Sequence, residues 1–250
     1  MDVVTYAIAS VILVSAVSFV GVAALAISRK RLQRMLLYMV AFSAGALLGD
    51  VFFHLLPETV ETVGFTSQVS LYVLSGIAVF FVVEKVVLRT HASNAARSKR
   101  ESVHSFAVMN LLGDGIHNFI DGLIIGASYI VATPIGIATT LAVVLHEIPQ
   151  EIGDFGVLMR GGFSRKKALL FNFITALTAV AGAGVALALN SYVGGLTDFL
   201  IPFAAGGFIY IAGADLIPEL HKESGALQSL LQTAALMLGL FVMLLLKTAG

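Results

Sequence analysis

The sequence predicts an all-α polytopic membrane protein with eight transmembrane helices. Of its 250 residues, 58% are hydrophobic and only 12% are charged, and the mean hydropathy is +0.95. In soluble domains about a quarter of all residues are charged. Apolar runs also recur along the whole chain, each long enough to supply the roughly 20 helical residues that cross a hydrocarbon core. A soluble core could not bury so much apolar surface, so we interpret residues 1–250 as a single transmembrane domain.

The eight predicted spans are separated by polar breaks rich in turn-forming residues. They cover residues 3–28, 34–56, 68–89, 104–130, 135–160, 166–189, 197–218 and 226–247. The first run is too long for a cleaved signal peptide and has no basic region before it, so we expect the protein to keep it. The longest break predicts a polar loop at about 90–103.

Lys and Arg gather in alternate connections, and such residues are retained on the cytoplasmic side of a membrane. They follow the first, third and fifth spans: Arg29, Lys30, Arg31, Arg34, Arg89, Arg97, Lys99, Arg100, Arg160, Arg165, Lys166 and Lys167. The opposite connections hold Glu58, Glu61 and Asp198 without Lys or Arg, and only Lys247 near the C-terminus lies on that side. We therefore predict a cytoplasmic (inner or plasma) membrane location, a cytoplasmic 90–103 loop and both termini outside.

Two segments match at a fixed offset and predict an internal repeat. Residues 44–58 read AGALLGDVFFHLLPE and residues 205–219 read AGGFIYIAGADLIPE, so that His54 corresponds to Asp215. In the predicted orientation the two helices run in opposite directions, which makes the repeat inverted, as in many secondary transporters. The alternative is that Ala-Gly and Pro-Glu are common helix punctuation.

Polar residues stand in the middle of the fourth and fifth spans. The fourth places four of them on one helix face, at spacings of three and four: Asp114, His117, Asn118 and Asp121. The fifth carries five on two adjacent faces: His146 and Gln150, then Glu147, Glu151 and Asp154. Each ionised group at mid-membrane costs about 2.5–3.5 kcal/mol on insertion scales. No Lys or Arg lies between Glu101 and Met159, so protons or a bound cation must compensate these carboxylates.

The residue types favour a divalent cation as that counter-charge. The chain has no Cys, so a metal must bind imidazole, carboxylate, amide or water. Histidine with Asp and Glu suits zinc, and also iron, manganese or cobalt, whereas magnesium and calcium prefer oxygen alone. Pro149 has no amide hydrogen for the carbonyl of Leu145, which predicts a kink within the polar stripe. A hydrogen-bond network that only holds the helices together is the alternative interpretation.

Further polar residues predict a route through the membrane. Asp50, His54 and Glu58 follow one another at intervals of four in the second span, rising toward the outer surface. Other acidic residues lie beside the centre or toward the cytoplasmic end: Asp114, Asp154, Asp215, Glu219 and Glu84. For Glu84, helix capping or an ion pair with Lys85 is an alternative to a role in the route, and the sequence favours neither. The net charge of zero gives no indication of a nucleic-acid partner.

These motifs resemble those of the ZIP family of zinc- and iron-regulated metal transporters. HNFIDG at 117–122 is similar to the family's fourth-helix motif and HEIPQEIGD at 146–154 to its fifth-helix motif, with the Gly-Asp and Pro-Glu elements also present. The similarity covers essentially the whole chain. It implies a three-two-three arrangement in which the fourth and fifth helices are central and the flanking triplets are related by inversion.

The resemblance also implies a binuclear centre and transport toward the cytoplasm. One metal position would use His117, His146 and Gln150, and the second would use or share Asn118, Asp121, Glu147 and Glu151. A homodimer would follow by the same analogy. Two departures leave metal preference and the second position open: Gln150 stands where the closest subgroup usually has His, and Thr178 stands where some bacterial relatives have a bridging carboxylate.

Three other classes of protein stay as alternatives. His146 and Glu147 begin the H-E-x-x-H pattern of zinc proteases, but Gln150 replaces the second His and Pro149 distorts the turn that the motif needs. We therefore expect the protein not to be an enzyme. A membrane metal sensor would use the same ligands without flux, and a proton or cation channel would conduct through the same polar residues.

Overall fold

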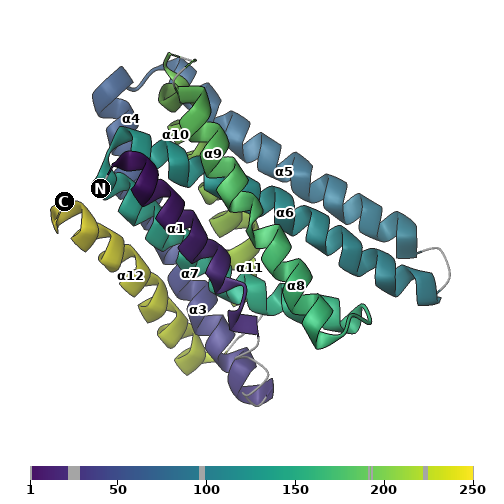
Figure 1. Ribbon diagram of the computed structural model, residues 1–250. Helices are drawn as coiled ribbons and strands as arrows, with labels where there is room; N and C mark the ends of the chain where they lie inside the picture. Colours follow the sequence, from purple (N-terminus) through teal and green to yellow (C-terminus); the bar gives the residue numbers. More distant parts are fainter. Residues whose placement is uncertain are drawn as a thin grey trace.

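The described chain is helical throughout and forms one elongated bundle (Figure 1). The computed structural model describes residues 2–21, 29–95, 99–190, 192, 194–221 and 225–249, and within these ranges it contains no strand. The helices are α1 (Val3–Val17), α3 (Arg29–Asp50), α4 (Leu56–Val63), α5 (Ser67–Ala95), α6 (Lys99–Val131), α7 (Thr133–Arg160), α8 (Arg165–Ala176), α9 (Thr178–Asn190), α10 (Leu196–Tyr210), α11 (Ile217–Leu220) and α12 (Ala226–Ala249). Two π-helical turns, η1 (Val51–Leu55) and η2 (Ile211–Leu216), join α3 to α4 and α10 to α11.

Five helical segments are long and apolar enough to cross a membrane: residues 35–63, 67–85, 165–190, 196–214 and 226–248. The other three predicted spans differ from these in length or polarity. The 15 residues of α1 are fewer than a span needs. By contrast, α7 has 28 residues and is therefore about 42 Å long, beyond the roughly 30 Å of a hydrocarbon core. It and α6 carry the polar stripes, which lower their hydropathy.

Two predicted boundaries differ from those in the structure. Helix α1 ends at Val17 rather than near residue 28, and the hydroxyl of Ser18 bonds to the carbonyl of Ser15 at this end; residues 22–28 lie outside the described chain. Helices α5 and α6 extend into the predicted 90–103 loop, as far as Ala95 and from Lys99. Ala, Arg, Lys and Glu favour helix even in water, so these helices continue beyond the apolar residues.

Glycines bring three pairs of helices into backbone contact. A Cβ atom on Gly122 of α6 would meet the carbonyl oxygen of Ala179 on α9, and one on Gly182 of α9 would meet that of Phe119 on α6. Two further pairs of helices have the same reciprocal glycine contacts. These glycines are Gly45 and Gly239 between α3 and α12, and Gly76 and Gly206 between α5 and α10. Small residues allow such close packing in a membrane, where apolar side chains alone provide little driving force between helices.

The two π-helical turns lie at equivalent places in the sequence repeat. The N–H of Leu56 bonds to the carbonyl of Val51, and the N–H of Ile217 bonds to that of Ala212, each five residues back. A proline follows directly in both segments. A proline ring clashes with the carbonyl four residues before it, and a widened turn relieves this clash. The matching geometry supports a true repeat over shared helix punctuation.

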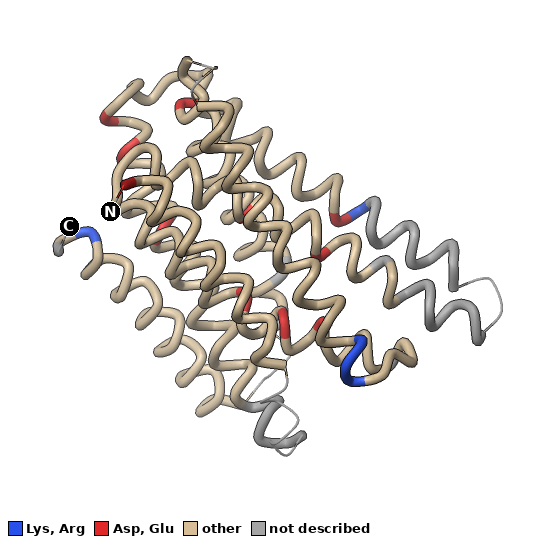
Figure 2. Tube along the Cα trace, viewed as in Figure 1, with Lys and Arg blue, Asp and Glu red and all other residues tan. Residues whose placement is uncertain are grey.

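The two ends of the bundle differ in charge. Figure 1 shows both termini toward the same end, as an even number of helical rods requires. In Figure 2 the basic turn at the start of α8, with Arg165, Lys166 and Lys167, lies at the opposite end, while Lys247 lies beside the C-terminus. The described Lys and Arg residues therefore divide between the ends as the sequence predicted.

Candidate metal centre

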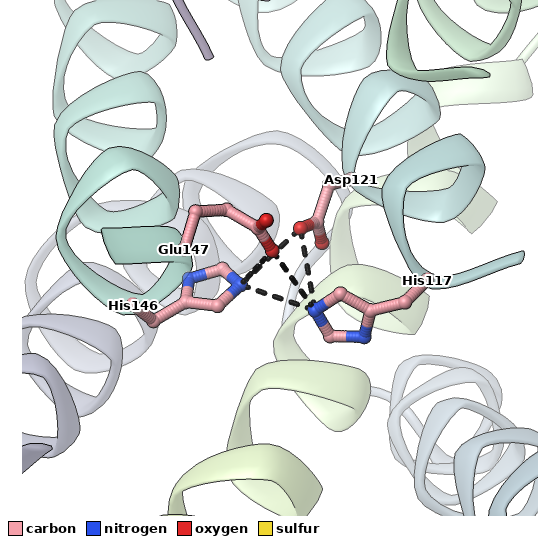
Figure 3. Close-up of side chains that lie close together, drawn as sticks. All are labelled: His117, Asp121, His146 and Glu147. Carbon is pink, nitrogen blue, oxygen red and sulfur yellow. Dashed lines mark hydrogen bonds and ion pairs between the residues drawn. The ribbon is translucent and has the colours of Figure 1, made fainter. Parts of the chain in front are cut away.

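Two histidines and two carboxylates converge between α6 and α7 (Figure 3). We call His117, Asp121, His146 and Glu147 the four-residue cluster. The Nε2 atoms of the two histidines are 3.2 Å apart. From His117 Nε2, Asp121 Oδ2 is 3.5 Å away and Glu147 Oε1 is 3.3 Å away. From His146 Nε2 the same oxygens are 3.2 and 3.4 Å away. Four potential ligand atoms thus surround one point.

The ring of His146 is held in the orientation that metal binding requires. Its Nδ1 lies 3.1 Å from the carbonyl oxygen of Ala142, one turn back on α7. A carbonyl can only accept, so Nδ1 carries the hydrogen and the neutral ring keeps its Nε2 lone pair toward the cluster. Metal-binding histidines commonly have such a second hydrogen bond, which fixes tautomer and orientation.

The carboxylates of the cluster are buried and lack hydrogen-bond donors. Asp121 and Glu147 are fully buried, and none of their four oxygen atoms has a hydrogen-bond partner among the described residues. They lie near the histidine Nε2 atoms, and a neutral His146 ring that carries its hydrogen on Nδ1 donates nothing to them. Buried carboxylates without partners are costly. A dication among these atoms would remove that cost, and two nitrogens with two oxygens form a donor set that suits tetrahedral zinc.

A second group of three carboxylates adjoins the cluster. Asp114, Glu147 and Glu151 each offer an oxygen within 4.8 Å of the others, and all three are buried. Glu147 belongs to both groups. We call Asp114, Glu147 and Glu151 the carboxylate group. The structure thus places Asp114, which we predicted in the polar stripe and along the route but not as a ligand, next to the four-residue cluster.

Two predicted ligands stand apart from these groups. The amide nitrogen of Asn118 donates to Asp114 Oδ1 over 2.8 Å and to the Asp114 carbonyl over 3.2 Å, while its own Oδ1 is buried and unpartnered. Gln150 lines a cavity beside the centre. Neither completes the tight cluster as it stands.

A cavity of about 300 Å³ adjoins the centre on one side. It is lined by residues that include Asp114, His117, Gln150, Asp154 and Glu84. The side chain of His117 is 16% exposed, whereas that of His146 is 1% exposed. Glu84 and Asp154 lie on the parts of α5 and α7 that lead to the basic end. The cavity therefore lies on the side of the centre that leads to the basic turn of α8.

Polar residues on the other side of the centre are closed in. Asp50 and His54 are 0% and 2% exposed, with Asp50 Oδ1 and His54 Nδ1 3.4 Å apart at the start of η1. No side-chain oxygen or nitrogen of either residue has a described hydrogen-bond partner. Glu58, one turn further out, lines a separate cavity of about 230 Å³ with Asp198. Of the remaining predicted route residues, the side chains of Asp215 and Glu219 lie outside the described residues.

The structure adds residues that sequence reasoning missed. Asn172 of α8 is fully buried and donates a hydrogen bond to Glu151. Asn110 of α6 donates to Asp154 over 2.8 Å. In the sequence each is a single amide within an apolar run, which gives little indication of a function. Their role becomes visible only from the carboxylates that they contact. Thr178, at the position of the departure noted above, donates its hydroxyl to the carbonyl of Gly115 over 2.7 Å and so joins α9 to α6.

Known proteins are similar to this chain over most of its length. The profile of the ZIP zinc transporter family matches residues 1–105 and 89–247. The chain belongs to the ZIP family. Zinc transporter ZIP13 of Pongo abelii is 37% identical over 222 residues, which cover 83% of this chain and 65% of the relative. Zinc transporter zipt-7.2 of Caenorhabditis elegans is 34% identical, covering 84% and 58%.

A third ZIP relative is matched over nearly the whole chain. Zinc transporter SLC39A7 of Canis lupus familiaris is 31% identical, covering 96% of this chain and 70% of the relative. The chain thus spans between 58% and 70% of the length of these three relatives. The ZIP membership confirms the family predicted from the motifs, and it makes the chain a multi-pass membrane protein.

Proposed function

We propose that this ZIP family chain transports divalent metal ions, zinc first, through the centre between α6 and α7. The observation that carries the proposal is the four-residue cluster, where two imidazoles and two unpartnered carboxylates meet inside a membrane-embedded bundle. Its donor set suits zinc, and iron, manganese and cobalt are further candidate substrates. The relatives named above are described as zinc transporters. No role as an enzyme is proposed, because a flux pathway accounts for the same residues.

The ion route follows the polar residues on either side of the centre. An ion enters from outside past Glu58 and the buried pair Asp50 and His54, loses water and binds the four-residue cluster. It leaves past Asp154 and Glu84, through the cavity on the side of the basic end. The basic end is cytoplasmic by the positive-inside tendency, so flux runs into the cytoplasm and both termini lie outside. The membrane is the cytoplasmic one, and Asp215 and Glu219 lie near the exit.

Alternating access comes from the three-two-three arrangement. Helices α6 and α7 contact each other and helices of both flanking sets. The matching π-helical turns and the matching glycine contacts of α3 with α12 and α10 with α5 support two inverted flanking triplets. Rocking of the bundles around the centre then closes the cytoplasmic cavity and opens the outer side.

The carboxylate group supplies a second ion position that shares Glu147 with the first. Asp114 and Glu151 complete it, in place of the Asn118 and Asp121 that the family resemblance implies. Two dications would balance the four buried carboxylates of α6 and α7, with Asp154 beside them, better than one, since no described Lys or Arg forms an ion pair with them.

The test is zinc uptake into liposomes that hold the purified chain and a zinc-sensitive dye. We expect flux in the unmodified chain and a loss of at least tenfold in His117→Ala. Gln232→Ala is the control, because it removes a buried side chain of α12 that takes no part in the route. The same assay with iron and manganese ranks the substrates.

The outcomes separate transport from its alternatives. Zinc binding without flux in folded protein would replace the carrier with a membrane metal sensor. Proton flux without metal flux under a pH gradient would indicate a channel. Equal zinc flux in His117→Ala and the unmodified chain would remove the cluster from the route.

A further inference from the structure

Asn172 is a buried amide whose contacts the transport route does not explain. It lies on α8, outside the two helices that carry the motifs, and is 0% exposed. Its Nδ2 donates to Glu151 Oε2 on α7 and to the carbonyl of Ser18, 3.4 Å away, just beyond the end of α1. One amide therefore joins three elements at a carboxylate of the centre.

The bond leaves the other oxygen of Glu151 free for a ligand. Oε1 of Glu151 is buried and has no described hydrogen-bond partner, and Glu151 offers one carboxylate oxygen to the carboxylate group. Asn118 makes an equivalent hydrogen bond to Asp114. Its amide donates to Asp114 Oδ1, while Asp114 Oδ2 has no described partner. Two amides thus each satisfy one oxygen of a carboxylate and leave the second without a donor.

Packing alone does not account for this arrangement. An amide donor is neutral, so it orients a carboxylate without cancelling its charge. The described carboxylates of the group have no Lys or Arg partner. Three carboxylates within 4.8 Å of one another repel unless protons or a cation neutralise their charges. Carboxylate oxygens without imidazole are the donor set of manganese, magnesium or calcium more than of zinc.

We propose that Asn172 is a positioning residue that turns Glu151 toward Asp114 and Glu147, and so builds an oxygen-only position for a manganese-type divalent cation beside the histidine-containing zinc position. This inference rests on the proposed function, since it divides the centre of the transporter into two positions of different preference. Asn118 orients Asp114 for the same position. The histidine cluster keeps zinc, because its two nitrogens do not depend on Asn172.

The experiment measures metal binding rather than flux. The full-length chain in detergent is loaded with one equivalent of zinc and titrated with Mn²⁺, whose free concentration is read by electron paramagnetic resonance. The unmodified chain binds one Mn²⁺ beside the zinc. Asn172→Ala lowers the Mn²⁺ affinity by about 10- to 100-fold, as loss of a residue that orients a metal ligand does, while zinc affinity changes by less than about threefold.

Two variants guard the interpretation. Asn172→Leu keeps a branched side chain with the same number of heavy atoms but without the donor, so it must weaken Mn²⁺ binding as Asn172→Ala does. Gln232→Ala removes an amide that is 5% exposed, on α12, and leaves both metals unchanged. Unchanged Mn²⁺ affinity in both Asn172 variants, or no Mn²⁺ binding beside zinc in the unmodified chain, overturns the proposal. Equal loss of zinc and Mn²⁺ does so too, since it indicates a merely structural role. A chain that binds both ions without flux refutes only the transport function.

Discussion

Helix α6 has two buried interfaces that are built in opposite ways. Toward α9, Gly122 and Gly182 let the backbones touch, and no side chain separates them. Toward α7, His117 and Asp121 reach across to their partners, and a cavity adjoins them. The first interface is close-packed and excludes any ligand, whereas the second leaves polar atoms without partners. The difference shows how one helix can belong both to a tightly packed framework and to a polar cluster whose buried carboxylates lack hydrogen-bond partners among the described residues.

The largest effect should come from the polar interface. Ligand binding stabilises a folded protein by RT ln(1 + [L]/Kd), about 2.7 kcal/mol at 100 times Kd. We expect zinc to raise the unfolding temperature of the detergent-solubilised chain, and His146→Ala to lose most of that increase. Thermal unfolding with and without zinc measures both. If zinc raises the unfolding temperature of His146→Ala as much as that of the unmodified chain, zinc does not stabilise the protein through the interface of α6 with α7.

At the glycine interface, an added side-chain atom should lower the stability of the protein without changing its stabilisation by zinc. Gly122→Ala places a Cβ against the carbonyl of Ala179, and overpacking of this kind costs about 1–3 kcal/mol. We expect a lower unfolding temperature with the zinc-dependent increase retained. Gly184→Ala on α9 is the control, because its Cβ would meet no atom within 4 Å. If both glycine variants unfold like the original chain, the backbone contact of α6 with α9 is looser than the structure indicates.

A smaller effect is expected where one hydroxyl joins two helices. Ser15 Oγ of α1 donates to the carbonyl of Ala176 at the end of α8 over 2.8 Å. Hydrogen bonds between membrane helices average about 0.6 kcal/mol, so Ser15→Ala should lower the free energy of unfolding by about this amount. Ser75→Ala is matched to it, because among the described residues the Ser75 hydroxyl donates to the carbonyl of Tyr72 within its own helix and to no other helix. Denaturation in mixed micelles compares the free energies of unfolding of the two variants. If Ser15→Ala lowers this free energy by more than about 2 kcal/mol, the hydroxyl contact matters as much as the glycine contact of α6 with α9.

Local patterns predicted much of the fold and part of the site. Helical spacing placed His117 with Asp121, and the facing motif supplied His146 and Glu147; the structure brings these four together. The family assignment from the same motifs is confirmed. Their role as metal ligands stays a prediction. Eight spans were predicted, but length and composition support five, because α1 is short and the polar stripes that mark α6 and α7 also lower their hydropathy.

Other contacts could not be predicted from spacing. Asp114 was expected along the route and lies instead in the carboxylate group, while Asn118 turns toward Asp114. A helix face spans several residues, so periodicity alone does not say which of its members reach the neighbouring helix. The partner of Asn172 was equally hidden, since Glu151 is 21 residues away along the chain and on another helix.

The sequence by itself determined the all-helical class, the division of basic residues between the ends, the repeat and the motifs of the family. These follow from composition and from the period of a helix, which are local properties. Tertiary structure decided which carboxylates meet, which oxygens keep a hydrogen bond and which side of the centre is open. Those outcomes depend on how each helix is rotated against its neighbours, and contacts such as that of Gly122 with Ala179, between residues on different helices, set the rotation.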